Sequence, residues 1–568
     1  MADHLRALTE AGVLADIDLY FGESMADLGG TPAVCLSAAA VSAMYRAGHA
    51  CLPLAEAGKP IAAVVPRATS DGDEATGRAT QVRLPTHDAW RDALAASPVV
   101  ASDGAFDPPR PLVLDRDRLY LHRLHQAECR LAERVLELAT RRAREPAADA
   151  TGFPQIPDDA VQAALDGLCI VTGGPGTGKT TLAASLIGLL VAAGAAKPWR
   201  IGLVAPTGKA ATRLQEAVKT QLGARGLCNR VPALADFQPD ASTIHRLLTR
   251  SALPLDALIV DECSMVDLSL MTRLTDVLPD ACRLILLGDA EQLASVEPGS
   301  VFSDLCGVGE DSPLASCIVR LTESHRFDPS RGIGRLADAI VHGDATAALA
   351  TLQSDADGQT GLNPLDDEAA FEAFAGECAA QWRSHITALR TEPEATPPFP
   401  SRRVLCAHRH GPYGVNRLNR LVERRLRDVG AIGDDEFFVG RPIIVTRNDR
   451  HTGLSNGDTG VVVDVDGRHQ VWFPELDQAD GRFLVSPSRL PQHESFFALT
   501  VHRAQGSEYD EVLFVPGDAA SQVCTRELFY TAVTRARRQV TVLAQEQTVR
   551  AAVERVTTRA SGLGTRLE

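Results

Sequence analysis

The stretch "VTGGPGTGKTTL", from Val171 to Leu182, decides the fold of the region around it. Between Gly173 and Thr180 it matches the pattern G-x-x-x-x-G-K-[ST] in full, with an apolar run before it and a helical pattern after it. Glycines let the backbone N–H groups of such a loop surround phosphate groups. The sequence therefore predicts a nucleotide-binding loop between a buried strand and a helix.

Two side chains of this loop have definite expected roles. Lys179 neutralises charge on the β- and γ-phosphates, and the hydroxyl of Thr180 reaches Mg²⁺. The expected cofactors are therefore ATP and Mg²⁺. The nucleotide-binding residues form one run: Gly173, Gly174, Pro175, Gly176, Thr177, Gly178, Lys179, Thr180 and Thr181.

A pair of acidic residues follows a second apolar run, in "LIVDECSM". Asp261 and Glu262 stand at the carboxyl end of a predicted strand, where α/β sheets bind their ligands. We expect Asp261 to hold Mg²⁺ and Glu262 to polarise the attacking water. An acidic pair in this place can also serve as a helix cap, but the phosphate loop upstream favours the catalytic interpretation.

Three further residues indicate how the energy of the nucleotide is used. Gln292, in "LILLGDAEQLASV", is a candidate γ-phosphate sensor, and Arg326 and Arg535 are candidate cations for the transition state. Arg535 is expected on a helix of a second α/β lobe. An arginine that reaches the phosphates only when two lobes close supplies about 10³–10⁵ in rate, or about 4–7 kcal/mol. Hydrolysis would then depend on lobe closure.

The pattern of apolar runs predicts an α/β fold with parallel sheets. Short runs such as "LCIVT", "IGLVAP", "ALIVDE" and "RLILLGD" alternate with helical segments, and "RVLCAH", "EVLFVP" and "QVTVLA" form a second set. We expect an N-terminal domain over residues 1–112, one lobe over 113–345 and a second lobe over 346–568. A β-rich module with Asn456-Gly457 and Asp466-Gly467 turns is expected at about 435–495.

Composition narrows the class of protein. The chain has 568 residues and a net charge of −16, which excludes a uniformly basic nucleic-acid coat but not a local basic groove. Its twelve cysteines form no C-x-x-C pair, which favours reduced, buried thiols over zinc or disulfides. No run of eighteen apolar residues and no leader pattern appears, so a cytoplasmic protein is expected.

Eight motifs occur in the order typical of superfamily 1 helicases. They are "GGPGTGKTT", "APTGKAATRL", "STIHRLL", "DECSMVD", "GDAEQLASVEPG", "ESHRF", "LTVHRAQGSEYDEV" and "YTAVTRARRQV". From Leu168 to Leu543 the chain most resembles the RecD group. The resemblance implies two RecA-like lobes, an SH3-like β insertion in the second lobe and an ATP-dependent helicase that moves 5′→3′ on DNA.

The resemblance also implies partners. "GHACLPL" and "LYLHRLHQAECRLA" are similar to the front end of the RecD subunit, which works with RecB-like and RecC-like subunits as a heterotrimer on double-strand DNA ends in recombinational repair. A stand-alone RecD-like helicase stays open as the alternative, although no helix-hairpin-helix repeats are found. Residues 1–112 carry no catalytic motif but are apolar enough to fold, so we expect them to dock a RecC-like partner.

For single-stranded DNA, the resemblance points to small polar donors that contact phosphate and sugar without reading sequence. These residues are Thr207, Lys209, Thr243, His245, Thr500, His502 and Gln505. A local cap or turn is the alternative role for each of them. Such helicases also read adenine with a glutamine about seventeen residues before the loop, and Gln155 and Gln162 both stay open for that role.

Other functions of the same loop are less consistent with the sequence. Nucleases of such complexes carry [DE]-x-K, but no acid stands two positions before any of the five lysines, so cutting is expected elsewhere in the complex. A phosphotransferase would have no second α/β lobe. A scaffold with a silent ATPase is disfavoured because Lys179, Asp261, Glu262 and both arginines are present.

Overall fold

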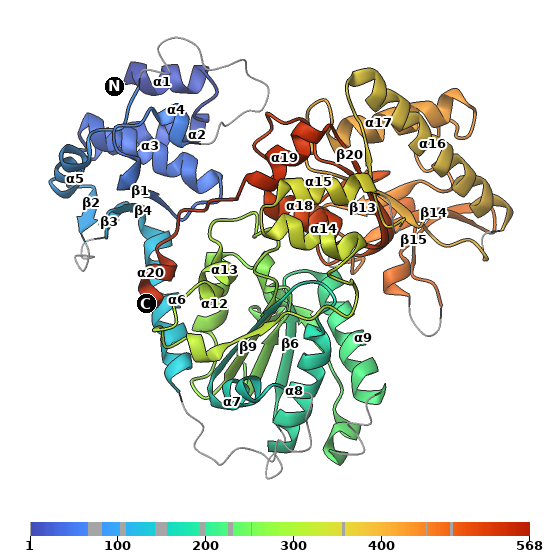
Figure 1. The fold of residues 1–568 in the computed structure, drawn as a ribbon, viewed down its shortest axis with the longest axis horizontal. Helices are drawn as coiled ribbons and strands as arrows, with labels where there is room; N and C mark the ends of the chain where they lie inside the picture. Colours follow the sequence, from blue (N-terminus) through green and yellow to red (C-terminus); the bar gives the residue numbers. More distant parts are fainter. Residues whose placement is uncertain are drawn as a thin grey trace.

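The computed structural model describes most of the chain. The described residues are 2–65, 82–102, 109–141, 156–193, 199–224, 231–250, 253–354, 358–392, 394–449, 451–477 and 481–568. Figure 1 shows three bodies: an N-terminal domain in blue, a first lobe in cyan to green, and a second lobe in yellow to red. No helix within these ranges is both long and apolar enough to cross a membrane.

The N-terminal domain packs helices against a small sheet. The helices are α1 (Ala2–Glu10), α2 (Asp16–Asp27), α3 (Pro32–Arg46), α4 (Ile61–Val64) and α5 (His87–Ala95). The sheet has the order β1-β4-β3-β2, formed by Cys51–Pro53, Arg118–Leu121, Leu112–Asp115 and Val100–Ser102. Buried side chains of α3, including Val34, Cys35 and Val41, form the centre of its core. The region predicted to fold without catalytic motifs is therefore a packed domain.

Helix α6 (His122–Thr140) leads from this domain into the first lobe. Leu124, Leu131, Val135 and Leu138 are buried on one face, as the amphipathic pattern of the sequence indicates. That face packs against α12 (Leu268–Asp276) in the core of the first lobe. The helix therefore joins the two bodies through a continuous apolar contact.

The first lobe contains a six-stranded parallel sheet with the order β10-β5-β9-β8-β6-β7. Its strands are β5 (Leu168–Gly173), β6 (Ile201–Ala205), β7 (Ala241–Thr243), β8 (Ala257–Val260), β9 (Arg283–Gly288) and β10 (Ile318–Leu321). Alternate residues of β5 enter different cores: Leu168 and Ile170 face α6 and α12, whereas Cys169 and Val171 face α7 (Asp158–Asp166) and α8 (Lys179–Ala193). Both faces are covered, as expected for a buried parallel sheet.

The second lobe repeats this architecture with five parallel strands in the order β11-β20-β19-β12-β18. These strands are Thr360–Asn363, Ala536–Leu543, Tyr509–Val515, Arg402–Cys406 and Ala498–Thr500. One face is covered by α14 (Gly332–Val341), α15 (Ala345–Ser354), α18 (Arg526–Val533) and α19 (Glu546–Glu554), and the other by α16 (Glu368–Thr391) and α17 (Val415–Asp428). The predicted two-lobed α/β fold is therefore confirmed.

The border between the lobes lies within a connecting segment. The sequence placed the end of the first lobe at residue 345. In the structure Phe327, Ile333 and Leu336 already pack in the core of the second lobe. The segment between β10 and α14 therefore carries the chain from one lobe to the other.

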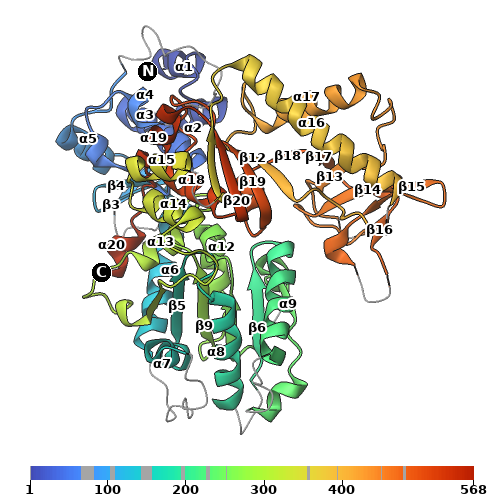
Figure 2. The ribbon, with the colours of Figure 1, turned by 45° about the vertical axis from the view of Figure 1, so that its right-hand side comes forward.

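The β-rich module predicted at about 435–495 is a five-stranded antiparallel sheet with the order β16-β15-β14-β13-β17. Its strands are Leu484–Val485, Arg468–Trp472, Thr459–Val465, Pro442–Val445 and His493–Ser495. Asp466 and Gly467 form the tight turn between β14 and β15 with positive φ angles of 53° and 75°. Figure 2 shows this sheet below α16 and α17, at the right-hand side of the second lobe.

After α19 the C-terminal tail returns to the other two bodies, as Figure 1 shows in red. The backbone of Ala560 bonds to Ala50 and to His49 Nδ1 of the N-terminal domain. The last helix, α20 (Leu563–Leu567), buries Leu563 and Leu567 in the core shared with α6. The tail thus links the second lobe to both the first lobe and the N-terminal domain.

The cysteines have the environments expected from the sequence. Eleven of them lie in the described ranges, and ten of these are buried. Burial raises the pKa of thiols such as Cys263, Cys378 and Cys524. These side chains behave as small apolar residues of the core.

Candidate nucleotide site between the two lobes

The phosphate loop joins β5 to α8 in the first lobe, as predicted. Gly176 and Gly178 have φ angles of 80° and 88°, which side chains rarely allow. A Cβ on Gly176 would lie 2.4 Å from Cβ of Arg326, and one on Gly173 would lie 2.7 Å from the carbonyl oxygen of Leu321. The glycines are therefore required both by backbone conformation and by close packing against the end of β10 and the segment that follows it.

The segment that follows β10 donates hydrogen bonds to the phosphate loop. The N–H of His325 donates to the carbonyl of Gly176 at 2.9 Å, and the hydroxyl of Ser324 donates to the carbonyl of Pro175 at 3.2 Å. Thr177 donates from its hydroxyl to the carbonyl of Gly174 at 2.9 Å. The connection between the lobes is thus hydrogen-bonded directly to the loop.

Lys179 begins α8 and points back across the loop. Its Nζ donates to the carbonyls of Gly173 and Gly174 at 2.6 and 3.0 Å. Phosphate oxygens carry full charge and accept stronger hydrogen bonds than these carbonyls. The ammonium is therefore positioned to transfer to phosphate, next to Thr180 and Thr181 in the first turn of the helix.

Asp261 and Glu262 follow β8 at the carboxyl edge of the same sheet. Asp261 Oδ1 accepts from the N–H of Glu262 at 2.9 Å, and Glu262 has a left-handed backbone with φ of 54°. Burial and the charge of Glu262 raise the pKa of Asp261, while the loop ammonium of Lys179 opposes that shift. Two adjacent, half-buried carboxylates favour a bound cation, which would relieve their repulsion.

The donor set fits Mg²⁺. A carboxylate on Asp261 and a hydroxyl on Thr180 are the oxygen ligands this ion prefers, and the remaining positions suit water and substrate phosphate. The described part of the chain holds no cluster of three or more His, Cys, Asp or Glu side chains at metal-binding distance.

Gln292 lies in a buried hydrogen-bond group at the lobe boundary. Its Nε2 donates to Asp289 Oδ2 at 2.9 Å, and the hydroxyl of Tyr530, from the second lobe, donates to the same oxygen at 3.2 Å. A Cβ on Gly174 would lie only 2.9 Å from that hydroxyl. The phosphate loop, the predicted sensor and the second lobe therefore meet around Asp289.

The two predicted arginines occupy different surroundings. Arg326 lies against Gly176 and forms an ion pair with Glu508 of the second lobe at 2.5 Å. Arg535 was expected on a helix, but it lies in the turn between α18 and β20, because α18 ends at Val533. Its side chain is 4% exposed and donates to the carbonyls of Thr531 and Ser507. In this conformation Arg535 stabilises the second lobe internally.

The residues predicted to contact DNA lie at the facing edges of the two lobes. Thr207 lies just after β6, Thr243 ends the neighbouring strand β7 of the first sheet, and Thr500 ends β18 of the second. Each threonine hydroxyl accepts from a backbone N–H three residues further on and so caps a short turn or helix. These local caps are compatible with the alternative that the sequence left open.

The other predicted DNA contacts differ in exposure. His245 is exposed, whereas burial and the charge of Arg559 lower the pKa of His502. Lys209 forms an ion pair with Glu475 of the β insertion at 2.6 Å. Gln505 is 8% exposed and donates to the carbonyl of Leu293, so in this conformation it bridges the lobes and does not line a groove.

A cavity of about 390 Å³ lies beside the phosphate loop. It is lined on one side by Thr177, Gly178 and Thr181, and on the other by Arg320, Glu323 and His325. Gln162 donates to Asp166 within α7, and Gln155 lies outside the described residues. The cavity therefore offers room for a ligand next to the loop.

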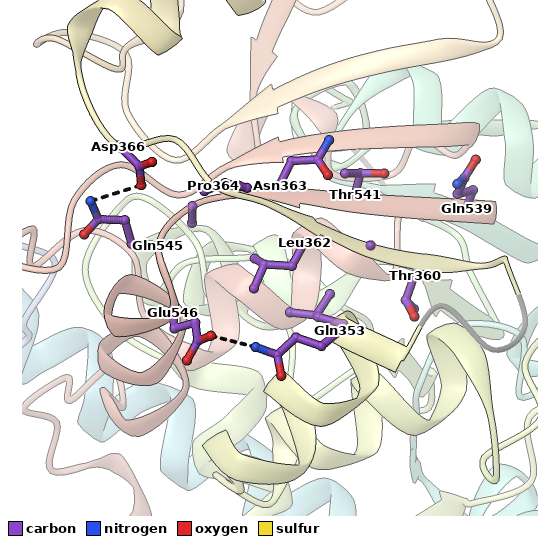
Figure 3. Close-up of a pocket in the computed structure, with 13 residues that line it drawn as sticks. Gln353, Thr360, Leu362, Asn363, Pro364, Asp366, Gln539, Thr541, Gln545 and Glu546 are labelled. Carbon is purple, nitrogen blue, oxygen red and sulfur yellow. Dashed lines mark hydrogen bonds between the residues drawn. The ribbon is translucent and has the colours of Figure 1, made fainter.

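A second cavity, of about 720 Å³, lies at the outer edge of the second lobe along β11 and β20 (Figure 3). Its polar side chains bond to one another: Gln353 donates to Glu546 at 2.7 Å, and Gln545 donates to Asp366 at 3.4 Å. None of the predicted site residues lines it. The predicted catalytic residues therefore lie around the phosphate loop between the lobes and not at this second cavity.

Sequence reasoning missed the second-lobe residues that meet the loop. Tyr530 and Glu508 stand within the quoted stretches "YTAVTRARRQV" and "GSEYD", but nothing in their spacing shows that they cross the interface. Thr531 similarly accepts from the N–H of Leu293 at 2.9 Å. These contacts depend on how the lobes are placed relative to each other.

Comparison with known proteins matches both lobes and the N-terminal domain to protein families. Residues 158–359 match the model of an AAA domain, and residues 495–543 match the UvrD-like helicase C-terminal domain. With the two parallel sheets and the loop between them, these matches define a superfamily 1 helicase. Residues 10–120 match the N-terminal domain of the RecBCD enzyme subunit RecD.

The full-length relatives agree with that assignment. The RecBCD enzyme subunit RecD of Mycolicibacterium smegmatis is 41% identical over 85% of this chain and 87% of its own length. The subunit of the same name from Mycobacterium tuberculosis is 37% identical over 99% of this chain and 96% of its own length. The chain therefore belongs to the RecD family, and it is an ATP-dependent DNA helicase. The ATP-dependent RecD2 DNA helicase of Deinococcus radiodurans is 30% identical over 88% of this chain but only 64% of its own length.

Proposed function

We propose that this chain is the motor subunit of a RecBCD-type helicase–nuclease, and that it moves 5′→3′ along single-stranded DNA from double-strand ends in recombinational repair. It would work in the cytoplasm with RecB-like and RecC-like subunits. The observation that carries the proposal is the shared contact of phosphate loop, Asp289 and Tyr530, because it joins the nucleotide site directly to the second lobe. A motor needs such a joint to convert hydrolysis into movement.

Each residue of the site has a separate role in the proposed mechanism of ATP hydrolysis. Lys179 would exchange its loop carbonyls for the β- and γ-phosphates, and Gln292 would turn from Asp289 towards the γ-phosphate. Glu262 would orient and deprotonate the attacking water. Mg²⁺ held by Thr180 and Asp261 would stabilise charge on the phosphate oxygens.

The two arginines would act at different stages. Arg326 is already next to the loop, so it can reach phosphate with a small side-chain movement. Arg535 would first have to leave the carbonyls of Thr531 and Ser507 as the lobes close. A cation that arrives late stabilises the transition state more than the bound substrate.

The predicted DNA contacts would line a groove where the lobes face each other. Thr207, Thr243 and Thr500 are small donors at strand ends, and His245 is exposed beside them. Lys209 would become available to phosphate once its pair with Glu475 opens. Contacts of this kind hold a backbone and leave sequence unread.

Strand displacement tests the polarity. The complex should displace a strand from a duplex with a 5′ single-stranded overhang when this motor alone is active, with its RecB-like partner carrying a substitution in its own phosphate loop. It should fail on the matching 3′ overhang. Preference for the 3′ tail in this assay would refute the proposed direction.

The N-terminal domain supports the subunit interpretation over the stand-alone alternative. Ile17 and Tyr20 on α2, and Leu28 just after it, are large apolar side chains that are 64%, 66% and 57% exposed. Such a surface is more typical of an interface than of a DNA groove. Arg6, Arg46 and Lys59 are the only lysine or arginine residues among residues 1–60.

Surface substitutions test this docking without removing the domain. The double variant Ile17→Asp, Tyr20→Asp should no longer co-purify with a RecC-like partner, while its own DNA-stimulated ATPase persists. Val429→Asp, at an exposed apolar position of the second lobe, is the control and should assemble normally. Normal assembly of the double variant would favour the stand-alone alternative or a contact elsewhere.

A further inference from the structure

Glu508 lies between two arginines at the lobe interface. Its Oε1 accepts from Nη2 of Arg326 at 2.5 Å, and its Oε2 accepts from Nε of Arg537 at 3.1 Å. Arg326 belongs to the segment that connects the lobes, whereas Glu508 immediately precedes β19 of the second lobe. Each carboxylate oxygen is therefore engaged by a different cation.

Arg326 is incompletely satisfied by this arrangement. Its Nη1 is buried and has no hydrogen-bond partner among the described residues. A buried guanidinium nitrogen without an acceptor carries a desolvation cost that an additional acceptor would relieve. Because the Cβ of Arg326 lies against Gly176, that acceptor can be a group bound in the phosphate loop.

Glu508 is ionised in this environment. Burial disfavours its charged form, but Arg326 and Arg537 outweigh that effect and hold the pKa of Glu508 below its usual range. The carboxylate therefore acts as a permanent counter-ion for Arg326 near neutral pH. A γ-phosphate entering the loop would bring a larger negative charge to the same guanidinium and repel Glu508.

We infer that Glu508 is a positioning residue that holds Arg326 while the loop contains no γ-phosphate and releases it when ATP binds. This inference rests on the proposed role of Arg326. Release would free the segment around Glu508. In that segment the carbonyl of Gly506 accepts from Arg213 of α9 (Gly208–Ala224), and Gln505 donates to the carbonyl of Leu293. The exchange would thus pass the state of the nucleotide to the part of the second lobe that leads to Thr500 and His502.

The inference makes a prediction that a merely structural ion pair does not. If Glu508 competes with phosphate for Arg326, its neutral isostere must strengthen the binding of nucleotides that carry a γ-phosphate. If the pair only stabilises the fold, the same change must weaken binding or leave it unchanged. ADP provides an internal comparison because it lacks the group for which the two compete.

The test uses the full chain with Glu508→Gln and isothermal titration with ADP and a non-hydrolysable ATP analogue. The variant should bind the ATP analogue about fivefold more tightly, while ADP affinity changes less than about twofold. Glu511→Gln is the matched control, since Glu511 lies on the following strand, β19, and pairs with exposed Arg402 of the neighbouring β12. It should leave both affinities unchanged.

Arg537→Ala gives an opposite and independent expectation. Removing this half-exposed arginine leaves the whole charge of Glu508 to Arg326, so the ATP analogue should bind about twofold more weakly. The inference would be overturned if the wild type binds both nucleotides normally and Glu508→Gln does not bind the ATP analogue more tightly. It would also be overturned if Glu508→Gln gains as much affinity for ADP as for the analogue. A wild-type chain that binds neither nucleotide would overturn both this inference and the proposed function.

Discussion

The hydroxyl of Tyr530 in the second lobe donates to Asp289 in the first lobe, with 3.2 Å between the oxygens. Asp289 is 2% exposed and accepts from Gln292 through the same oxygen. Burial, followed by the charge of Asp289, raises the pKa of Tyr530, so the phenol stays protonated and remains a donor. The carboxylate of Asp289 thus accepts hydrogen bonds both from Gln292, the predicted γ-phosphate sensor, and from Tyr530 of the second lobe.

Tyr530→Phe should therefore weaken the coupling between the lobes while the nucleotide site still binds nucleotide. The ring still fills its place, but one hydrogen bond to a buried carboxylate is lost, at a cost of about 1–2 kcal/mol. We expect nucleotide affinity to change less than about threefold and DNA-stimulated turnover to fall about tenfold. Steady-state ATPase with and without single-stranded DNA measures both, with Tyr413→Phe as the control. Equal losses with and without DNA would contradict the coupling role.

Glu262→Gln should separate binding from chemistry. The amide keeps the shape of the side chain next to Asp261 but cannot accept a proton from water. Hydrolysis should fall at least about 100-fold while ATP binding stays within about threefold. Equilibrium binding and single-turnover hydrolysis check this, and Glu297→Gln, at an exposed position, should behave as wild type. Lost affinity with normal turnover would show that Glu262 has another role.

The C-terminal tail makes a stability prediction through Arg566. This residue pairs with Asp115 and Glu128, which are almost completely buried. Arg566→Ala leaves both carboxylates in place without that cation, so the tail contact should weaken by about 3–5 kcal/mol. Thermal unfolding and limited proteolysis of the tail measure the effect. Arg116→Ala removes an exposed donor to the neighbouring Thr565 carbonyl and should cost no more than about 0.5 kcal/mol.

The contact of His49 with the tail should depend on pH. Burial and the charge of Arg559 lower the pKa of His49 to about 4, and its Nδ1 accepts from the N–H of Ala560 only when unprotonated. The folded pKa lies below the unfolded value of about 6.5, so stability is complete above that pH and falls as the pH drops from about 6.5 towards 4. At pH 5.5 the loss should be about 1 kcal/mol.

His49→Asn tests that dependence. The amide oxygen can accept the same hydrogen bond but does not titrate. Thermal midpoints measured between pH 7.5 and 5 should fall less steeply for the variant than for the wild type. Identical slopes would show that other groups cause any acid sensitivity.

The strands that build the two sheets could be predicted where an apolar run marks them. β5, β8 and β9 are continuous Val, Ile and Leu segments buried on both faces, which is a strong local signal. β7, β11 and β18 are three or four residues long and include Ser, Thr, Gly or Asn. They are strands because a neighbouring strand pairs with them, and the sequence pattern does not carry that information.

Some residues of the candidate site could likewise be predicted from the sequence and others could not. Lys179, Asp261 and Glu262 could be predicted because a short motif fixes their place at the edge of one sheet. The pairs Arg326–Glu508 and Lys209–Glu475 join residues far apart in the chain and depend on lobe placement. The expected helical position of Arg535 was wrong because α18 ends two residues earlier. Three threonines predicted to contact DNA also cap the turns that follow them, a role that threonine favours.

ATP hydrolysis stimulated by single-stranded DNA, compared between the wild type and Lys179→Gln, tests the central claim most directly. Among the described residues, the Nζ of Lys179 donates to the loop carbonyls of Gly173 and Gly174, so its replacement should leave the fold intact, as circular dichroism would check. The account predicts that the wild type hydrolyses ATP faster when DNA is added and that the variant loses at least about 100-fold of that rate. DNA-stimulated hydrolysis that persists unchanged in Lys179→Gln would contradict the assignment of this loop as the motor's nucleotide site.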